Sequence, residues 1–115
     1  MTEGVKTIIY PVKDLAKAKT LYSKLLGVEP YMDEAYYVGF NVEGQDIGLD
    51  PHGYSHEMTG PVGYWHVDGL TKSLKALLDA GAEAQQEAKD VGEGKLTASV
   101  KDADGNVIGL IQSSS

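Results

Sequence analysis

The sequence predicts an α+β fold built from two similar modules, each with one helix and about four strands. The phrase Gly-x-x-Ile-Gly-Leu occurs twice, within residues 44–50 and again within 105–111. The order strand, helix, three strands also occurs twice in a chain of 115 residues. An internal repeat of this kind indicates repeated supersecondary units, and the length suits one domain with a real core. We therefore predict a single domain, 1–115, made of modules at about 1–52 and 60–112.

The first module opens with an apolar, β-branched stretch, VKTIIYPV (5–12), which is typical of a strand. Asp14 follows as a helix N-cap, and Gly27 is the expected C-cap. Between them apolar residues recur at helical spacing and predict a buried helix face: Leu15, Ala18, Leu21, Tyr22, Leu25 and Leu26. Three strand-like pieces come next, VEPYM, AYYVGFNV and DIGLD, with a hairpin turn at Gly44 between the last two.

The second module repeats this order. PVGYWHV (61–67) is a predicted strand, and a helix with apolar spacing from Leu70 to Leu78 closes at Gly81. The polar segment 82–91 is expected to form a weak edge strand followed by a loop, before strands at 95–101 and 107–112 joined by the turn DADGN. Neither half can hide both faces of its sheet. We therefore expect the two βαβββ modules to pair into a curved mixed sheet around a cleft, with the helices outside.

Composition excludes several classes of function. The chain has no cysteine, which excludes disulfides and thiolate chemistry. Its net charge of −7 argues against binding to nucleic acid or to an anionic membrane surface. The N-terminus lacks the apolar core of a signal peptide, and no apolar run approaches the roughly 20 residues that span a bilayer. We expect a soluble cytoplasmic protein with no nucleic-acid or membrane partner.

Two segments resemble a known family. YPVKDLAKAKTLYSKLLGVEP (10–30) resembles the first strand–helix unit of the vicinal oxygen chelate superfamily, which includes glyoxalase I, bleomycin-resistance proteins and extradiol dioxygenases. DADGNVIGLIQ (102–112) resembles the closing hairpin of that family, and the resemblance extends over essentially the whole chain. It implies two βαβββ modules that form a cleft, and it implies a homodimer, because many members are homodimers.

The resemblance also locates the positions where metal enzymes of the family hold their ion. These positions fall on Thr7, Val62, Gly48 and Gly109, where histidine or glutamine, histidine, glutamate and glutamate would be expected. Glycine and valine side chains cannot bind a metal, and a lone hydroxyl makes a poor site. We therefore predict that this chain uses neither a metal nor another cofactor, with a divalent metal as the alternative.

The glycines within the two repeated strands have two interpretations. A glycine in a strand interior often marks a bulge or a close approach of a ligand or of backbone. The matching pair Gly48 and Gly109 indicates either a cleft floor cleared for a ligand or relief of packing where sheets meet.

Alternation along strands groups the candidate binding residues, because residues i and i+2 share a face. If Val62 faces the cleft, Tyr64 and His66 do too, and the same reasoning groups the candidates on the other strands. His66 suits a ligand oxygen or general-base catalysis near neutral pH, or a purely structural hydrogen bond. The predicted ligand-binding residues are Thr7, Tyr37, Asn41, Gly48, Asp50, His52, Tyr54, Tyr64, His66 and Gly109.

The segment DPHGYSHEMTGP (50–61) joins the modules and contains Asp50, His52 and His56 in the pattern D-x-H-x3-H. On a helix this spacing could hold zinc, but the prolines and glycines around it predict a loop. The alternatives are a mobile lid in which Tyr54 and Met58 touch a ligand, or a plain solvated linker.

These observations predict a metal-independent protein of the glyoxalase and bleomycin-resistance type that binds a partly aromatic organic molecule in the inter-module cleft. Aromatic bodies with polar tips suit such ligands, and five of the seven tyrosines lie in or beside the predicted cleft strands and the joining segment: Tyr31, Tyr36, Tyr37, Tyr54 and Tyr64. Core packing is the alternative for these five, and Tyr10 and Tyr22 are expected in the core. No catalytic residue is assigned. One alternative is a metal-dependent lyase, isomerase or dioxygenase that uses non-standard ligands such as His52, His56 and His66. Another is a structural dimer whose cleft is filled by its own side chains.

Overall fold

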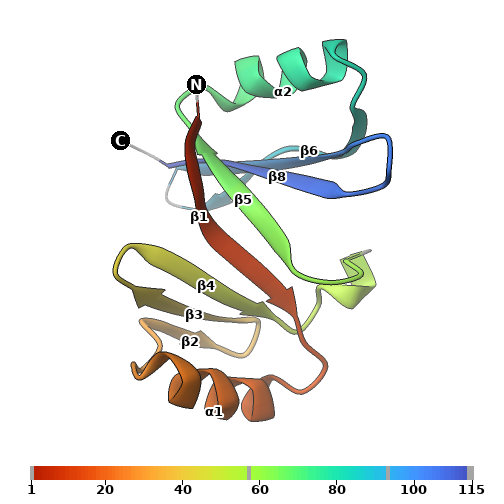
Figure 1. Ribbon diagram of the computed structural model, residues 1–115. Coiled ribbons are helices and arrows are strands. Elements are labelled where there is room, and N and C mark those ends of the chain that lie inside the picture. The colour runs from red at the N-terminus through yellow and green to blue at the C-terminus, as the bar shows by residue number, and fades with distance from the viewer. Residues whose placement is uncertain (1, 57, 93, 114–115) are drawn as a thin grey trace. The chain divides into compact units, whose positions relative to one another are not determined.

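The computed structural model describes residues 2–56, 58–92 and 94–113. Along the chain the elements are β1 (Thr2–Pro11), α1 (Leu15–Leu26), β2 (Met32–Glu34), β3 (Tyr37–Val42), β4 (Gln45–Asp50), the 3-10 helix η1 (Tyr54–His56), β5 (Val62–Val67), α2 (Leu70–Asp79), β6 (Glu83–Gly92), β7 (Lys95–Lys101) and β8 (Val107–Gln112) (Figure 1). The order strand, helix, three strands thus occurs twice, as predicted. Within the described ranges, no helix has the length and apolar character needed to cross a membrane.

The chain divides into two compact units, which β1 joins. The N-terminal unit comprises residues 6–62, and the C-terminal unit comprises residues 2–5 and 63–113. In the N-terminal unit the strand order is β2-β3-β4-β1, with β1 parallel to β4 and the other neighbours antiparallel. In the C-terminal unit the order β5-β8-β7-β6 repeats this scheme, with β5 parallel to β8. The mixed strand directions and the two helices confirm the α+β class.

The core of the N-terminal unit lies between α1 and the sheet (Figure 1). Val38, Phe40 and Leu49 are fully buried there. The helix begins at its predicted cap, since the Asp14 carboxylate accepts from the backbone N–H of Lys17 at 3.0 Å. The partly buried residues around this core are Tyr10, Val12, Leu15, Ala18, Tyr22, Leu26 and Ile47.

One part of the predicted helix face is wrong. Leu21 and Leu25 were expected on the buried face, but they are 66% and 73% exposed. The buried stripe is narrower, because Leu15, Ala18, Tyr22 and Leu26 already fill the contact with the sheet. The outer side of α1 therefore keeps two leucines in solvent.

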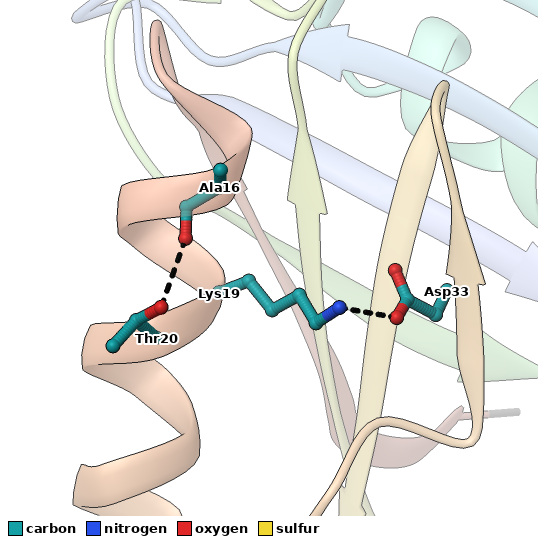
Figure 2. A network of polar contacts seen from close by, with 4 residues as sticks. All are labelled: Ala16, Lys19, Thr20 and Asp33. Carbon is teal, nitrogen blue, oxygen red and sulfur yellow. Dashed lines mark hydrogen bonds and ion pairs between the residues drawn. The ribbon is translucent and has the colours of Figure 1, made fainter.

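Local contacts fix the ends of α1 and the hairpin after it. Gly27 takes a left-handed conformation at the C-cap, with φ of 72°. Lys19 makes an ion pair with Asp33 of β2, and within the helix the hydroxyl of Thr20 donates to the carbonyl of Ala16 at 3.2 Å (Figure 2). Together the cap and the ion pair attach the helix to the strand that follows it.

The turn between β3 and β4 sets the register of the closing strand. Val42 pairs with Gln45, which leaves a two-residue loop. Glu43 and Gly44 both have positive φ, 49° and 85°. This combination belongs to the type I′ turn, whose twist matches that of the strands. The predicted hairpin at Gly44 is confirmed.

The C-terminal unit has an equivalent core beneath α2. Val67, Leu70, Ala98 and Leu110 are buried, and they are flanked by Leu74, Leu77, Leu96 and Ile108. The polar segment expected to form a weak edge strand and then a loop instead forms β6 over ten residues, Glu83–Gly92. β6 pairs antiparallel with β7 along its length, and the register of the pairing shifts at three places. Backbone hydrogen bonding, and not side-chain burial, therefore holds β6 in the sheet.

The buried ring of Phe40 gives a direct test of the N-terminal core. We expect Phe40→Ala to lower the free energy of unfolding by about 3–5 kcal/mol, because its cavity cannot fully collapse. Urea denaturation followed by circular dichroism measures this. Tyr36→Ala, at a side chain 58% exposed, is the control and should change the value by no more than about 0.5 kcal/mol. Equal losses in both variants would contradict the described core.

Candidate functional site

The helix-free face of the N-terminal unit is the side of its sheet opposite α1. Strand pairing places Thr7, Asp46 and Asn41 in one row across β1, β4 and β3. The next row contains Ile9, Gly48 and Gly39, and Asp50 follows beside Pro11. By alternation Tyr37 shares this face with Gly39. The five sequence-predicted site residues on these strands, Thr7, Tyr37, Asn41, Gly48 and Asp50, therefore lie on one face, as predicted.

Tyrosine rings cover two glycines of this face. A Cβ added at Gly48 would lie 2.5 Å from Cζ of Tyr37 and closer still to its hydroxyl oxygen. A Cβ at Gly39 would lie 3.1 Å from both Cζ and Oη of Tyr31. An added Cβ at Gly48 would overlap the Tyr37 ring, and one at Gly39 would be held unusually close to the Tyr31 ring. The missing side chains therefore make room for the two phenol groups.

The C-terminal unit repeats this arrangement at its own glycine. Tyr64 of β5 pairs with Gly109 of β8, and a Cβ at Gly109 would lie 2.6 Å from Cδ1 of Tyr64. On the other side of Gly109, Ser99 pairs with it from β7. Ser99 is only 3% exposed, and its hydroxyl donates to Oε1 of Gln85 at 2.7 Å. Tyrosine, glycine and serine thus form one row.

These contacts answer the question posed by the repeated strands. Each repeated glycine lies under a tyrosine of a neighbouring strand of its own unit, and an aromatic ring over a glycine is a known way to repair the weakness of glycine in a sheet. The space is therefore occupied by the protein. Relief of packing is the interpretation that the contacts favour, although the packing partner is a phenol ring and not a second sheet.

A phenol–carboxylate pair lies beside the tyrosine-covered glycines. Partial burial of the phenol, the charge of Asp46 and a hydrogen bond to its carboxylate together raise the pKa of Tyr31 from 10.0 to about 12. The same carboxylate accepts a long hydrogen bond of 3.4 Å from the side-chain amide of Asn41. In the row through Asp46, Thr7 is 5% exposed. The cluster holds one negative charge with hydrogen-bond donors around it.

The turn after β4 packs against the end of β1. The backbone N–H of His52 donates to Oδ1 of Asp50 at 2.8 Å, and that of Met58 donates to the carbonyl of Gly53 at 3.0 Å. A Cβ at Gly53 would lie 2.6 Å from Cβ of Pro11 and 2.8 Å from the Met58 sulfur. This segment is therefore a folded turn and not a plain solvated linker.

The lid and zinc interpretations both concern the same turn. The ammonium group of Lys13 lies 5.4 Å from the centroid of the Tyr54 ring, within cation–π range. His52 is exposed, whereas the side chain of His56 lies outside the described part of the chain. The zinc interpretation of the D-x-H-x3-H pattern therefore has no described geometry, and the lid stays a prediction.

The residues at the four positions to which the resemblance assigns a metal do not fit a metal ion. Val62 is 6% exposed and has no donor atom, and neither has Gly48 or Gly109. Only the hydroxyl of Thr7 could contribute, and divalent ions need several histidine or carboxylate ligands. Among the described residues, no group of three or more histidine, aspartate and glutamate side chains is arranged to hold an ion.

The predicted site residues are therefore gathered in three places. The first five lie on the helix-free face of the N-terminal unit. Tyr64, His66 and Gly109 lie on β5 and β8 of the C-terminal unit, where the carbonyl of His66 accepts from the Thr2 hydroxyl at 3.2 Å. His52 and Tyr54 lie on the turn after β4.

Sequence reasoning assigned no role to two polar contacts. One is the pair Tyr31–Asp46, and the available signal for it was strand alternation, which puts Asp46 two residues before Gly48 and on the same face. The other is Ser99 with Gln85, which no pattern indicated because β6 is so polar.

Comparison with known proteins agrees with this architecture. The model of the Glyoxalase/Bleomycin resistance protein/Dioxygenase superfamily matches residues 4–110, so the chain belongs to that superfamily. No curated protein matches at the level required.

Solved structures show the same fold at low identity. One from Legionella pneumophila, described as an NAD-dependent benzaldehyde dehydrogenase, is 17% identical, with a TM-score of 0.75 over 94% of this chain and 98% of that one. Methylmalonyl-CoA epimerase from Mycobacterium tuberculosis is 18% identical, with a TM-score of 0.74 over 99% and 90%. The Mn(II)-bound glyoxalase from Novosphingobium aromaticivorans is 19% identical, with a TM-score of 0.71 over 96% and 39%.

The contact between Tyr64 and Gly109 can be tested by adding a single carbon. We expect Gly109→Ala to lower the free energy of unfolding by about 1–3 kcal/mol, because the new methyl group meets the rigid base of the ring. In a Tyr64→Ala background most of this cost should disappear, which a double-mutant cycle measures by urea denaturation.

Gly60→Ala is the matched control for Gly109→Ala, because nothing lies within 4 Å of a Cβ at Gly60. It should stay within about 0.5 kcal/mol of the parent protein. A Gly109→Ala cost that is the same with and without the Tyr64 ring would show that the ring is not the obstacle.

The raised pKa of Tyr31 predicts how the stability of the fold changes at alkaline pH. Its pKa is raised from 10.0 to about 12 in the folded protein. The stability that this proton contributes is therefore fully present below pH 10, and it is lost as the pH rises toward 12. We expect NMR titration of the Tyr31 ring, within the pH range where circular dichroism stays unchanged, to show no ionisation near pH 10.

Removing the neighbouring charge should reverse part of this shift. Asp46→Asn should lower the Tyr31 pKa toward 10, whereas Glu43→Gln, in the β3–β4 turn, should leave it in place. Ionisation of Tyr31 near pH 10 in the parent protein would contradict the phenol–carboxylate pair.

Proposed function

We propose that this protein binds a small, partly aromatic organic molecule without a metal, and that it contacts the ligand from the helix-free face of its sheet. The observation that carries the proposal is the replacement of two family metal positions by Gly48 and Gly109, each covered by a tyrosine. A side chain without donor atoms cannot hold an ion, whereas a phenol offers a flat apolar ring and a hydroxyl.

The N-terminal unit supplies the chemistry for such a ligand. Tyr31 and Tyr54 are 58% and 46% exposed, so their rings can still stack on a partner. Asp46 and Asp50 place carboxylates on the same face as Tyr37. Rings attract cations through their faces and carboxylates attract them through charge. An aromatic amine or ammonium compound therefore suits this face better than an anion does.

The predicted ligand-binding residues keep their roles in this proposal. Thr7, Tyr37, Asn41 and Asp50 would supply hydroxyl, amide and carboxylate groups. In the C-terminal unit, Tyr64 and His66 would supply a hydroxyl and an imidazole. His52 and Tyr54 would reach the ligand from the turn after β4. Gly48 and Gly109 would act indirectly by seating the rings of Tyr37 and Tyr64.

The competing function is metal-dependent catalysis, since the solved structures with this fold include a Mn(II)-bound glyoxalase. The two functions differ in metal content. We expect elemental analysis of untagged protein, purified without chelators, to find far less than one equivalent of zinc, nickel, iron or manganese per chain. Addition of these metals should leave the thermal unfolding temperature unchanged. One tightly held equivalent would overturn the metal-independent proposal.

A ligand screen then tests the binding face itself. Aromatic amines and aromatic ammonium compounds should raise the thermal unfolding temperature, and calorimetry of a compound that does so should show binding. Asp46→Asn should weaken that compound at least about 10-fold, which corresponds to about 1.4 kcal/mol. Glu43→Gln removes the same charge from an exposed residue of the β3–β4 turn and serves as the control. Equal binding by both variants would place the ligand elsewhere.

A further inference from the structure

The side of α1 that faces away from its sheet carries two exposed leucines. Leu21 and Leu25 are 66% and 73% exposed. Because they lie four residues apart on one helix, their side chains are neighbours. Val28, which is 37% exposed, follows just after the helix ends at Leu26. Exposed apolar groups that lie together, rather than scattered singly, are typical of contact surfaces.

Most of the positive charge of the N-terminal unit lies on the same helix. The unit contains five lysines and no arginine, and four of the five lie between residues 13 and 24. Lys19 is engaged by Asp33 (Figure 2). Lys17 and Lys24 are exposed, and by helical spacing they lie beside the two leucines. The outer side of α1 is thus apolar and positively charged, although the whole chain has a net charge of −7.

The equivalent helix of the C-terminal unit differs on its outer side. Leu74 and Leu77 of α2 pack against the core of that unit, and Leu78 is 38% exposed. The ammonium group of Lys75 donates to the carboxylate of Asp79 at 2.9 Å, so acidic and basic groups are paired along this helix. A helix in this position therefore does not need a strongly exposed, basic and apolar outer side in order to cover its sheet. The outer side of α1 has a composition that the fold alone does not explain.

We propose that the α1 surface, formed by Lys17, Leu21, Lys24, Leu25 and Val28, binds an acidic amphipathic helix of a different protein. Charge complementarity selects this occupant, because glutamates or aspartates beside its apolar stripe would face the two lysines. A helix also repeats apolar side chains at the three- and four-residue spacing that the leucines present. Exposed ion pairs contribute little free energy, so the apolar contact supplies the affinity and the lysines select the partner. This surface lies on the side of the sheet opposite the proposed ligand face, and the proposal does not depend on that ligand.

Fluorescence anisotropy with a labelled synthetic peptide tests the apolar part of the α1 surface. The probe is a helical peptide of about 20 residues with leucine at every third or fourth position and glutamate beside each leucine. The parent protein should bind it with a dissociation constant below about 1 mM. Leu21→Ser combined with Leu25→Ser should raise this constant at least about 10-fold. Leu78→Ser is the matched control, since Leu78 is an exposed leucine of α2, and it should leave binding unchanged.

Charge reversal tests the basic part of the surface. Lys17→Glu combined with Lys24→Glu should also weaken the acidic peptide at least about 10-fold, because attraction becomes repulsion. Lys72→Glu combined with Lys89→Glu changes the net charge by the same amount at two exposed lysines of the C-terminal unit. This control should retain most of the binding. Added salt should weaken the parent complex, because it screens the charges.

Three results would overturn the proposal. The parent protein could fail to bind the acidic peptide up to about 1 mM, or the control variants could lose as much binding as the α1 variants while circular dichroism shows all of them to be folded. Finally, vesicles of anionic phospholipid could bind the parent protein through the two leucines when the peptide does not, which would make the occupant a membrane surface. Asp46→Asn, which tests the ligand face, should leave peptide binding unchanged, so the two proposals fail separately.

Discussion

The contact of a tyrosine ring with a strand glycine is the interaction on which both units depend. Each unit has one helix for two sheet faces, so α1 or α2 covers one face and the other needs a different cover. Tyr37 over Gly48 and Tyr64 over Gly109 supply part of that cover from neighbouring strands. The glycine is required because a Cβ at either position would overlap the ring. The second glycine of the repeated sequence Gly-x-x-Ile-Gly-Leu is therefore needed in both units for the same reason, which is to make room for a tyrosine ring.

The two units solve this requirement with different chemistry. At Gly48 the closest groups are the hydroxyl end of Tyr37, whereas at Gly109 they are the base of the Tyr64 ring. The hydroxyl end of a ring can move with a small rotation, but its base is fixed by the backbone. The neighbouring polar groups differ too, because Asp46 brings charge to the N-terminal unit and Ser99 with Gln85 brings a neutral hydrogen bond to the other. If the proposed ligand is charged, the N-terminal unit therefore offers it the better match.

Much of the fold could be predicted from the sequence because its signals are local. Asp14 and Gly27 mark the ends of a helix by their own backbone and side-chain chemistry, and Gly44 marks a two-residue turn. The full length of β6 was not predicted, because backbone pairing with β7 holds this strand in the sheet. Backbone pairing produces no alternation of apolar residues that could be seen in the sequence. Leu21 and Leu25 were misplaced because helical spacing shows which residues share a side, and not how wide a stripe the sheet can cover.

The candidate site was predictable in its rows and unpredictable in its contacts. Alternation placed Thr7, Asn41 and Gly48 on one face, since a strand turns each second side chain the same way. It could not show that the ring of Tyr37 lies over Gly48, because that depends on the register between strands and on a rotamer. Glycine at positions 48 and 109 offers no side-chain donor atom and leaves room for the phenol rings of Tyr37 and Tyr64. The same two positions thus lack side-chain donor atoms and carry the aromatic surface on which the proposed metal-independent binding would depend.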